Sequence, residues 1–418
     1  MAAGAALACR RRADCRLCGS KRLELVFSLA ATPPANAFVK PEEASKPQEK
    51  FPLDLFLCRS CGHLQLLDIV DPAILFEHYV YVSGTSPVFV KHFEEYARDL
   101  LRRYQPGQGA LVVDIGSNDG TLLRFFKEAG LRILGVDPAR EISEAANKAG
   151  IETINDFFTP GLAARVKRER GAAAIVTANN VFAHADDLAG ILDGVHDLLA
   201  PDGVFACECS YLADVVEKTL FDMIYHEHVA YHAVGPLKRF LERHGFELIE
   251  ALRVESHGGS LRAISQKKGG PRRPGESVAL RLKEEAALGI EKPETMKAFA
   301  AQIEARKREL SSLLEMLKAQ GKTIAGFGAP AKATTLMHHF GLGKDVLDFI
   351  VDDSPWKQGL LSPGLHIPVV ASEELYRRKP DYVVILAWNF AEPIMKKHAA
   401  YRAAGGHFVI PLPTVEVS

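Results

Sequence analysis

The segment ALVVDIGSNDGTLLRFFKEAG, residues 110–130, constrains the fold of this chain most strongly. Its apolar run ends at Asp114, a turn with Gly116 and Gly120 follows, and apolar residues then recur at the spacing of a helix. The next apolar run, LRILGVDPA, ends at another acid, Asp137. A strand, a glycine turn, a helix and a second strand with a terminal carboxylate make the nucleotide-binding half of a doubly wound sheet. We therefore predict an α/β protein with a Rossmann-like domain at this place.

The turn D-I-G-S-N-D-G favours S-adenosylmethionine over a dinucleotide. Its glycine spacing is not G-x-G-x-x-G, and Asp114 and Asp119 would repel a pyrophosphate but attract the cationic sulfonium and amino group. Asp137 stands where a carboxylate can accept both ribose hydroxyls. The alternative is a doubly wound domain that binds nothing. The residues expected to contact the cofactor are Asp114, Gly116, Asn118, Gly120, Asp137, Asp156, Phe157 and Asn179, with Asp156 and Phe157 facing the adenine.

Four cysteines form two C-x-x-C pairs, in CRLCGS and CRSCGH. Each pair supplies two adjacent corners of a tetrahedron, so the pattern predicts one structural zinc ion held by Cys15, Cys18, Cys58 and Cys61. His63 could replace a cysteine as a ligand, but the four thiols already complete the site. Two unrelated reduced pairs are the alternative.

The segment KTIAGFGAPAKATTLMHHF predicts a second Rossmann-like domain near the C-terminal end. A strand is followed by Gly326, Gly328 and Pro330, and then by a helix whose first turn holds Lys332. Free backbone N–H groups at a helix N-terminus beside a lysine can bind phosphate, which suits a nucleoside diphosphate. A packing domain with a fortuitous glycine turn is the alternative. Substrate contacts are expected from Gly328, Pro330, Lys332, Asp352, Lys357, Trp388 and Asn389.

The organisation expected for the 418 residues is therefore a small N-terminal zinc-binding module, a central Rossmann-like domain and a second one. The boundaries are placed at 1–75, 76–280 and 321–418. Between the last two, apolar residues recur at helical spacing over 282–320, which predicts a helical linker at 281–320 made of one long amphipathic helix. This helix could equally carry a partner chain.

Composition excludes several classes of partner. Lys and Arg total 51 against 52 for Asp and Glu, so no strong field recruits nucleic acid or an anionic membrane. No apolar stretch approaches the roughly 20 residues of a membrane span. A cytoplasmic protein, monomeric or weakly homo-oligomeric, is the expectation. The Arg-rich beginning leaves a transit peptide open.

The stretch FDMIYHEHVAYH, residues 221–232, is a candidate proton-transfer centre. A zinc site is disfavoured because H-E-H lacks two histidines at i, i+4 on one helical face. A polar surface helix is also disfavoured, because two tyrosines and a phenylalanine lie among the histidines. Histidine is well matched to proton removal near neutral pH.

The order of these motifs, ending in HGGSLR, GFGAPAKATTL, VDDSPWKQG and LAWN, resembles the three-domain nucleotide-sugar C-methyltransferases that act on TDP-linked 4-keto-deoxysugars. The resemblance covers essentially the whole chain, from Cys15 to Asn389. It implies that the central domain is a class I methyltransferase domain and that the C-terminal domain helps to hold the sugar nucleotide. It also implies C-methylation of a TDP-linked sugar, at C3 or C5, in deoxysugar biosynthesis.

The resemblance also assigns the candidate catalytic residues. By its position in YHEH, the base proposed for the family falls on His228; Tyr225 would donate to the developing oxyanion. Glu227 would hold the hexose hydroxyls or orient the imidazole. His184, just beyond the strand that borders the cofactor, is the second candidate for proton handling. Further candidates are Tyr79, preferred over Tyr81 for reaching the active site, and Ser260 with Arg262, whose guanidinium could meet a phosphate or carbonyl.

Methylation of carbon needs a carbanion equivalent, which a sugar supplies only beside a carbonyl. A base that removes the proton alpha to a 4-ketone gives an enolate whose carbon can attack the sulfonium methyl. Two other classes remain: an O- or N-methyltransferase acting on a sugar or small metabolite, which needs no acidic carbon, and a non-catalytic assembly module.

Overall fold

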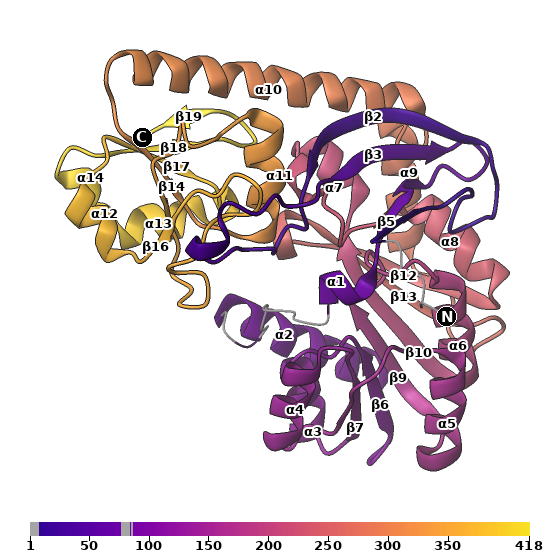
Figure 1. Ribbon diagram of the computed structural model, residues 1–418. Helices are drawn as coiled ribbons and strands as arrows, with labels where there is room; N and C mark the ends of the chain where they lie inside the picture. Colours follow the sequence, from indigo (N-terminus) through magenta and orange to yellow (C-terminus); the bar gives the residue numbers. More distant parts are fainter. Residues whose placement is uncertain (1–7, 77–83, 85–86) are drawn as a thin grey trace, which may run out of the picture.

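The computed structural model describes residues 8–76, 84 and 87–418. Tyr79 and Tyr81, two of the predicted active-site residues, lie outside the described residues. The other predicted site residues are all described. Figure 1 shows the zinc-binding region between the central domain and the C-terminal domain.

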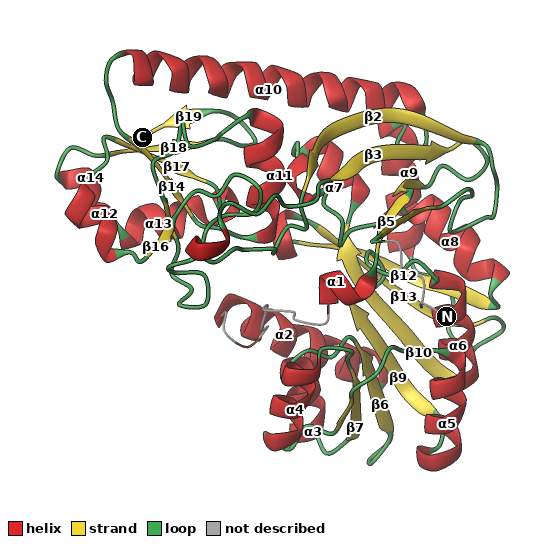
Figure 2. Cartoon of the chain, viewed as in Figure 1, coloured by secondary structure: helices red, strands yellow, loops and turns green. Residues whose placement is uncertain are grey.

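The central domain is built on one sheet, flanked by helices (Figure 2). Its strands are β6 (Leu111–Ile115), β7 (Arg132–Val136), β8 (Thr153–Ile154), β9 (Ala173–Asn179), β10 (Leu199–Ser210), β12 (Phe246–Val254) and β13 (Ser260–Lys267). Its helices are α2 (Pro87–Tyr104), α3 (Thr121–Glu128), α4 (Arg140–Lys148), α5 (Pro160–Arg170), α6 (Leu188–Leu198), α7 (Leu212–Glu217) and α8 (Val234–Arg243), with short turns η3 (Phe221–Met223) and η4 (Ser256–Gly258).

The strand order in this sheet is β12-β13-β10-β9-β6-β7-β8 in the described part of the chain. The five neighbouring strands β10, β9, β6, β7 and β8 run parallel to one another. Strand β13 is antiparallel to both of its neighbours, β10 and β12. All five residues of β6 are buried, as expected for a central strand covered on both faces. The chain order reverses between β6 and β9, so the carboxyl ends of these two strands form the crevice where ligands bind in such sheets.

The N-terminal region forms a small sheet, which is completed by a strand from residues 221–232, named the histidine segment from here on. Its elements are β1 (Cys9–Arg11), β2 (Leu23–Thr32), η1 (Pro41–Glu43), β3 (Phe51–Cys58), β4 (Leu64–Leu66), β5 (Asp68–Val70) and α1 (Pro72–Phe76). The order of the larger sheet, over the described residues, is β11-β4-β3-β2. Strand β11 (Ala230–Tyr231) comes from the central domain, with Ala230 opposite Gln65. The zinc-binding region is therefore joined to the segment that carries His228.

The C-terminal region is the second doubly wound sheet. Its strands are β14 (Ile324–Phe327), β15 (Ile350–Val351), β16 (Val369–Val370), β17 (Tyr382–Ile385), β18 (His407–Ile410) and β19 (Glu416–Val417), and its helices are α11 (Ala331–Phe340), α12 (Glu373–Arg378), α13 (Ala391–Lys397), α14 (Ala399–Ala403) and the turn η5 (Trp388–Phe390). Within the described residues, the order is β16-β15-β14-β17-β18-β19, with only β19 antiparallel. The crevice of this sheet lies between β14 and β17.

The prediction of one long helix over 282–320 is wrong. The structure has two helices, α9 (Glu276–Leu288) and α10 (Pro293–Ala319). Gly289 ends α9 in the left-handed conformation, at φ +66°, and Pro293 begins α10. Both signals are standard helix punctuation. Helix α10 runs over β2 and the C-terminal domain (Figure 1), and Phe299 packs against Phe27 with ring centroids 5.6 Å apart.

One hydrophobic core unites three regions of the chain. It contains Leu53 and Leu55 of the zinc-binding region, Phe221 of the histidine segment and Phe340 of the C-terminal domain. The rings of Phe221 and Phe340 stack with centroids 4.9 Å apart. The histidine segment thus packs against both the zinc-binding region and the C-terminal domain.

Among the described residues, no helix is both long enough and apolar enough to cross a membrane.

Candidate active site

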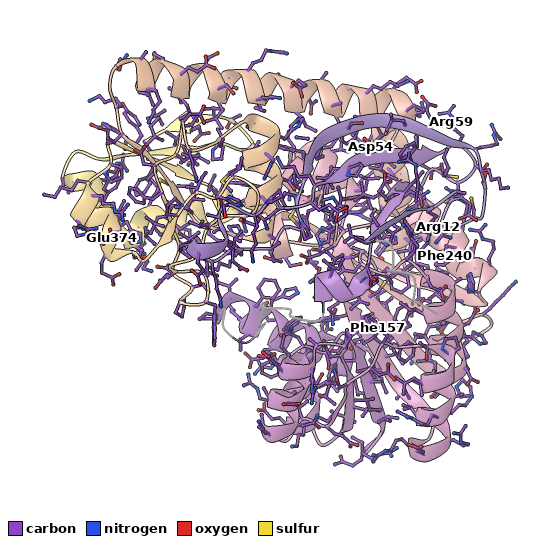
Figure 3. The ribbon with its side chains drawn as sticks, in the orientation of Figure 1. Arg12, Asp54, Arg59, Phe157, Phe240 and Glu374 are labelled. Atoms are coloured by element: carbon purple, nitrogen blue, oxygen red, sulfur yellow. The ribbon has the colours of Figure 1, made fainter. Side chains whose placement is uncertain are left out.

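A cavity of about 460 Å³ opens at the carboxyl ends of β6, β7 and β9. It is a size suited to a small ligand. Phe157 is half-exposed on its wall, and Figure 3 labels it on the side of the central domain that faces α1. Seven of the eight residues predicted to contact the cofactor line this cavity: Asp114, Gly116, Asn118, Asp137, Asp156, Phe157 and Asn179.

Gly120 is the eighth, and it does not line the cavity. It precedes α3 with φ +77°, and a Cβ there would collide with the side chain of Ile151. A left-handed backbone and this close approach explain why the turn needs glycine here. Gly120 therefore shapes the turn, while Gly116, Ser117 and Asn118 line the cavity.

The carboxylate of Asp137 is held by the backbone on both oxygens. Its Oδ2 accepts a hydrogen bond from the N–H of Asn118 at 2.8 Å, and its Oδ1 accepts one from Ala139 at 2.9 Å. Burial raises the pKa of Asp137, while these two bonds lower it in part. Asp137 thus orders the cofactor turn, and its remaining lone pairs can accept from a ribose.

Asp114 is buried beside the same cavity. Its Oδ1 accepts hydrogen bonds from the Thr177 hydroxyl at 2.6 Å and the Asn179 amide at 3.5 Å. Burial raises the pKa of Asp114 to about 7, although the bond from Thr177 lowers it. A cationic ligand beside this carboxyl would favour its ionised form. The cavity is therefore electrostatically suited to a sulfonium or ammonium group.

Two histidines from different elements stack at the edge of this cavity. His184 follows β9 and lines the cavity, and its ring lies against that of His228 with centroids 5.0 Å apart and planes at 29°. His228 precedes β11. The structure thus brings together the two residues that were predicted separately as candidates for proton transfer.

The contacts of His228 fix which nitrogen is basic. Its Nδ1 lies 2.7 Å from the carbonyl oxygen of Met223, which can only accept, so Nδ1 carries the proton of the neutral ring. Its Nε2 lies 3.0 Å from the hydroxyl of Tyr225, which donates to it. The rings of Tyr225 and His228 are 4.1 Å apart. The Tyr225 hydroxyl and the basic nitrogen of His228 are therefore adjacent, and their roles in oxyanion stabilisation and proton removal stay predictions.

Glu227 is oriented by the zinc-binding region and not by His228. Its Oε1 accepts a hydrogen bond from the Asn36 amide at 2.9 Å, and the described residues offer it no bond to an imidazole. Burial raises the pKa of Glu227 to about 7, against the smaller effect of Asn36. The described residues do not show Glu227 orienting an imidazole, and its contact with substrate hydroxyls stays a prediction.

The four cysteines of the C-x-x-C pairs come together. Their Sγ atoms all lie within 4.8 Å of one another, with Cys15 to Cys61 at 3.6 Å and Cys18 to Cys58 at 3.5 Å. A tetrahedral zinc with bonds of about 2.3 Å requires sulfur atoms about 3.8 Å apart. The donor set and its spacing therefore fit a zinc ion. His63 is not part of the group; its buried ring lies against His232, with centroids 5.5 Å apart.

The lysine predicted for a phosphate site is buried against a carboxylate. Lys332 Nζ lies 3.8 Å from Asp222 Oδ2 and 3.8 Å from the centre of the Trp388 ring. Trp388 Nε1 donates to the same Asp222 oxygen at 2.6 Å. Asp222 belongs to the histidine segment, so this contact joins that segment to the crevice between β14 and β17. Lys332 is therefore not an open cation facing solvent.

The other predicted residues of the C-terminal domain surround the same crevice. Gly328 has φ +86°, and a Cβ there would come within 2.5 Å of Ala387. Asp352 Oδ2 accepts from the N–H of Ala329 at 2.6 Å, and Lys357 Nζ donates to the Ala329 carbonyl at 2.8 Å. The flanking positions are Pro330, which caps α11, and Asn389, whose buried Oδ1 has no partner among the described residues.

Arg262 and Ser260 are directed elsewhere. The Arg262 guanidinium lies 2.9 and 2.8 Å from Glu208 Oε2, through Nε and Nη2, and stands 3.6 Å over the Tyr96 ring. The Ser260 hydroxyl donates to the Ser256 carbonyl at 3.1 Å. The structure does not bring either residue to the cavity. Arg262 meets a carboxylate of its own chain where a phosphate or carbonyl was expected.

Sequence reasoning missed Asp222 and Asp186. Asp222 stands within FDMIYHEHVAYH, where an acid among apolar residues was a usable signal. Asp186 lines the cavity two residues after His184, and the acidic pair in AHADDL was a similar signal. Their partners lie far away in the sequence, so no local spacing could reveal them.

Three family models match successive parts of the chain. They describe a zinc binding domain at residues 15–76, a methyltransferase domain at 89–251 and a C-methyltransferase C-terminal domain at 255–413. Among curated proteins, the chain is similar to C-methyltransferase NovU of Streptomyces niveus. The two are 35% identical over 404 residues, which is 97% of this chain and 96% of NovU.

Two solved methyltransferase structures match part of the chain. Magnesium protoporphyrin IX methyltransferase from Synechocystis, with bound S-adenosylmethionine, is 14% identical with a TM-score of 0.33, over 43% of this chain and 79% of its own. The Burkholderia thailandensis didemethyltoxoflavin N-methyltransferase, with bound S-adenosylhomocysteine, is 20% identical with a TM-score of 0.33, over 44% of this chain and 82% of its own.

Proposed function

The chain belongs to the C-methyltransferase family of NovU, and from this premise we propose that it methylates a ring carbon of a nucleotide-linked 4-keto-deoxysugar. As a member it is an enzyme that uses S-adenosylmethionine and carries a four-cysteine zinc site. The proposal concerns the substrate, a TDP-linked sugar methylated at C3 or C5, and the residues that act on it.

The observation that carries the proposal is the His184–His228 stack at the edge of the cofactor cavity. An O-methyltransferase needs only a base for a hydroxyl, whereas methylation of a saturated carbon beside a ketone must first break a C–H bond. In our proposal His228 Nε2 takes the proton alpha to the ketone, and the electron pair of that bond passes to the ketone oxygen as an enolate. His228 is held for this by the Met223 carbonyl on its other nitrogen.

Tyr225 is the proposed donor for the enolate oxygen. Its hydroxyl lies 3.0 Å from His228 Nε2, so a substrate bound beside both atoms would have a base near its alpha carbon and a donor near its ketone oxygen. His184 stabilises the imidazolium or the enolate from the cofactor side. S-adenosylmethionine supplies the methyl group, which the enolate carbon takes with release of the neutral thioether. Tyr79 remains a proposed contributor to this site.

Glu227 and the C-terminal domain are proposed to hold the rest of the substrate. Glu227 is buried and has one accepting oxygen beyond its bond to Asn36, which suits a hexose hydroxyl. The N-terminus of α11, after Gly328 and Pro330, faces the crevice of the second doubly wound sheet, where the nucleoside diphosphate would bind. Tyr81 and the region 321–418 complete this proposed substrate site.

The test is the position of the transferred methyl group. The protein is incubated with isotope-labelled S-adenosylmethionine and a TDP-linked 4-keto-6-deoxysugar, and the product is examined by NMR. We expect a new methyl bonded to a ring carbon adjacent to the ketone. A methyl bonded to oxygen or nitrogen would reject the proposal in favour of an O- or N-methyltransferase. A TDP-linked sugar without the ketone is the matched control and should not be methylated.

A further inference from the structure

Arg16 lies between two of the zinc-site cysteines, in the loop CRLC. Its side chain nevertheless reaches the two segments that carry His184 and His228. The side chain is fully buried at 0% exposure, and both terminal nitrogens donate hydrogen bonds. Its Nη1 bonds the carbonyl of Val229 at 2.7 Å, and its Nη2 bonds Asp186 Oδ1 at 3.2 Å. One guanidinium therefore bridges two segments that are distant in the sequence.

Each end of this bridge is next to a histidine of the stack. Val229 directly follows His228, and Asp186 is two residues beyond His184. The same two segments also meet through the backbone, because the N–H of Val229 donates to the Ala183 carbonyl at 2.8 Å. The stack is thus tied on one side by a backbone bond and on the other by Arg16.

The remaining contacts fix Arg16 to the zinc-binding sheet. Its Nη1 also donates to Gln65 Oε1 at 3.0 Å and to the Leu66 carbonyl at 3.1 Å, both on β4. Asp186 receives two further arginines, Arg12 at 2.9 Å and Arg10, both from the N-terminal region. A planar guanidinium can hold several acceptors in fixed directions, which a lysine ammonium cannot. The bridge therefore has a defined geometry and is not a loose charge contact.

We propose that Arg16 is a positioning residue for the histidine pair, through which the zinc-binding loop sets the spacing of the two imidazoles. Four thiolates on one Zn²⁺ hold the CRLC loop closed, and this fixes the backbone from which Arg16 extends. The inference rests on the proposed roles of His184 and His228. It assigns the zinc site a part in the reaction beyond holding its own loop together.

The expected effect is large, because a displacement of about 1 Å at a reacting group can cost a factor of about 100 in rate. Arg16→Lys keeps the charge but cannot bond Val229 and Asp186 together. We expect roughly tenfold to hundredfold slower alpha-proton exchange and methyl transfer in this variant, with the KM for S-adenosylmethionine nearly unchanged. Histidine side-chain nitrogen resonances of His184 and His228 should shift, a readout that does not depend on turnover.

Arg243→Lys is the matched control. Arg243, from α8, donates to the Leu17 carbonyl of the same zinc-binding loop at 2.7 Å. In the part of the chain that the structure describes, it has no hydrogen bond to the segments that carry His184 and His228. It should leave both the exchange rate and the histidine resonances at their wild-type values. Zinc content, measured in both variants, shows whether the loop has kept its metal.

Wild-type exchange and wild-type histidine resonances in Arg16→Lys would overturn the inference. If this variant does not fold, Asp186→Asn tests the other end of the bridge, because it keeps the shape and removes the charge that pairs with Arg16. Unchanged His184 resonances in Asp186→Asn would then overturn it. Failure of the proposed function gives a different result. If His228 is not the base, His228→Ala retains full exchange, whereas Arg16→Lys still shifts the histidine resonances if Arg16 positions the two rings.

Discussion

Trp388 donates its indole N–H to Asp222 Oδ2 at 2.6 Å across the boundary between the C-terminal domain and the histidine segment. The ammonium of Lys332 lies 3.8 Å from the same oxygen and over the Trp388 ring. The Asp222 carboxylate and the Lys332 ammonium are both buried. Burial raises the pKa of Asp222 and lowers the pKa of Lys332. Each group thus depends on the other to remain charged inside the protein.

Removing the lysine should therefore destabilise the protein strongly. We expect Lys332→Met to cost about 3 to 5 kcal/mol in the free energy of unfolding, because it leaves Asp222 as an uncompensated buried charge. The measurement is urea-induced unfolding followed by circular dichroism. Adding Asp222→Asn to this variant should recover part of the loss.

The control for this prediction is an exposed pair in the same domain. Lys397 and Asp353 are 2.6 Å apart, with side chains 55% and 52% exposed. Lys397→Met should change the stability by no more than about 1 kcal/mol. Equal effects at Lys332 and Lys397 would contradict the interpretation of the buried pair.

The affinity for S-adenosylmethionine should rise with pH through neutrality. The pKa of Asp114 is about 7 in the ligand-free protein, so the carboxyl is protonated below this pH and must lose its proton to face a cation. If the bound cation holds Asp114 ionised, raising the pH from about 6 to about 8 should tighten binding roughly tenfold, with proton release on binding. Titration calorimetry in two buffers of different ionisation enthalpy measures both. The Asp114→Asn variant should lose the pH dependence; if it keeps it, another group is responsible.

Asp137→Ala should weaken S-adenosylmethionine binding by about 1.5 to 3 kcal/mol, the range for hydrogen bonds to a charged group. The structure adds a second cause, since the carboxylate also orders the turn through Asn118 and Ala139. Asp137→Asn keeps one acceptor and separates the two effects. An unchanged calorimetric affinity in Asp137→Ala would place the ribose elsewhere.

Most residues that line the cavity, and the four-cysteine cluster, could be predicted from the sequence because both depend on local spacing. Asp114 is the second-last residue of β6 and Asp137 directly follows the neighbouring strand β7, so the topology of the sheet brings them together without further information. The same holds for two C-x-x-C turns that close on one ion. The break between α9 and α10 was also visible, as Gly289 followed by Pro293, but helical periodicity on both sides obscured it.

The sequence could not show which charged side chains satisfy one another. Lys332 stands at a helix start in a pattern typical of phosphate binding, yet Asp222 approaches it from another domain. Arg262 has a planar guanidinium that could bind a phosphate, but this group forms an ion pair with Glu208 on the neighbouring strand. Partners of this kind are decided by tertiary packing, which the spacing of residues along the chain does not encode.

The four-cysteine site should contain about one zinc ion per chain by metal analysis of freshly purified, reduced protein. Cys58→Ser should abolish zinc binding. It should also lower the melting temperature of the whole protein, because Cys58 and Cys61 pack in one hydrophobic cluster with Leu237 and Phe240 of the central domain. Cys209→Ser, at a buried cysteine outside the zinc site, is the control and should keep the metal. Absence of zinc from the wild-type protein would refute the site.

The central claim is that His228 removes a proton from carbon, and solvent exchange tests it most directly. A TDP-linked 4-keto-6-deoxysugar is incubated in heavy water without S-adenosylmethionine, and deuterium at the alpha carbon is followed by NMR. We predict exchange with the wild-type protein and a loss of roughly a hundredfold to ten-thousandfold in His228→Ala. Separate binding measurements should show that this variant keeps its affinity for the sugar nucleotide and for S-adenosylmethionine. Full exchange in His228→Ala, together with its loss in His184→Asn, would contradict the account and make His184 the base.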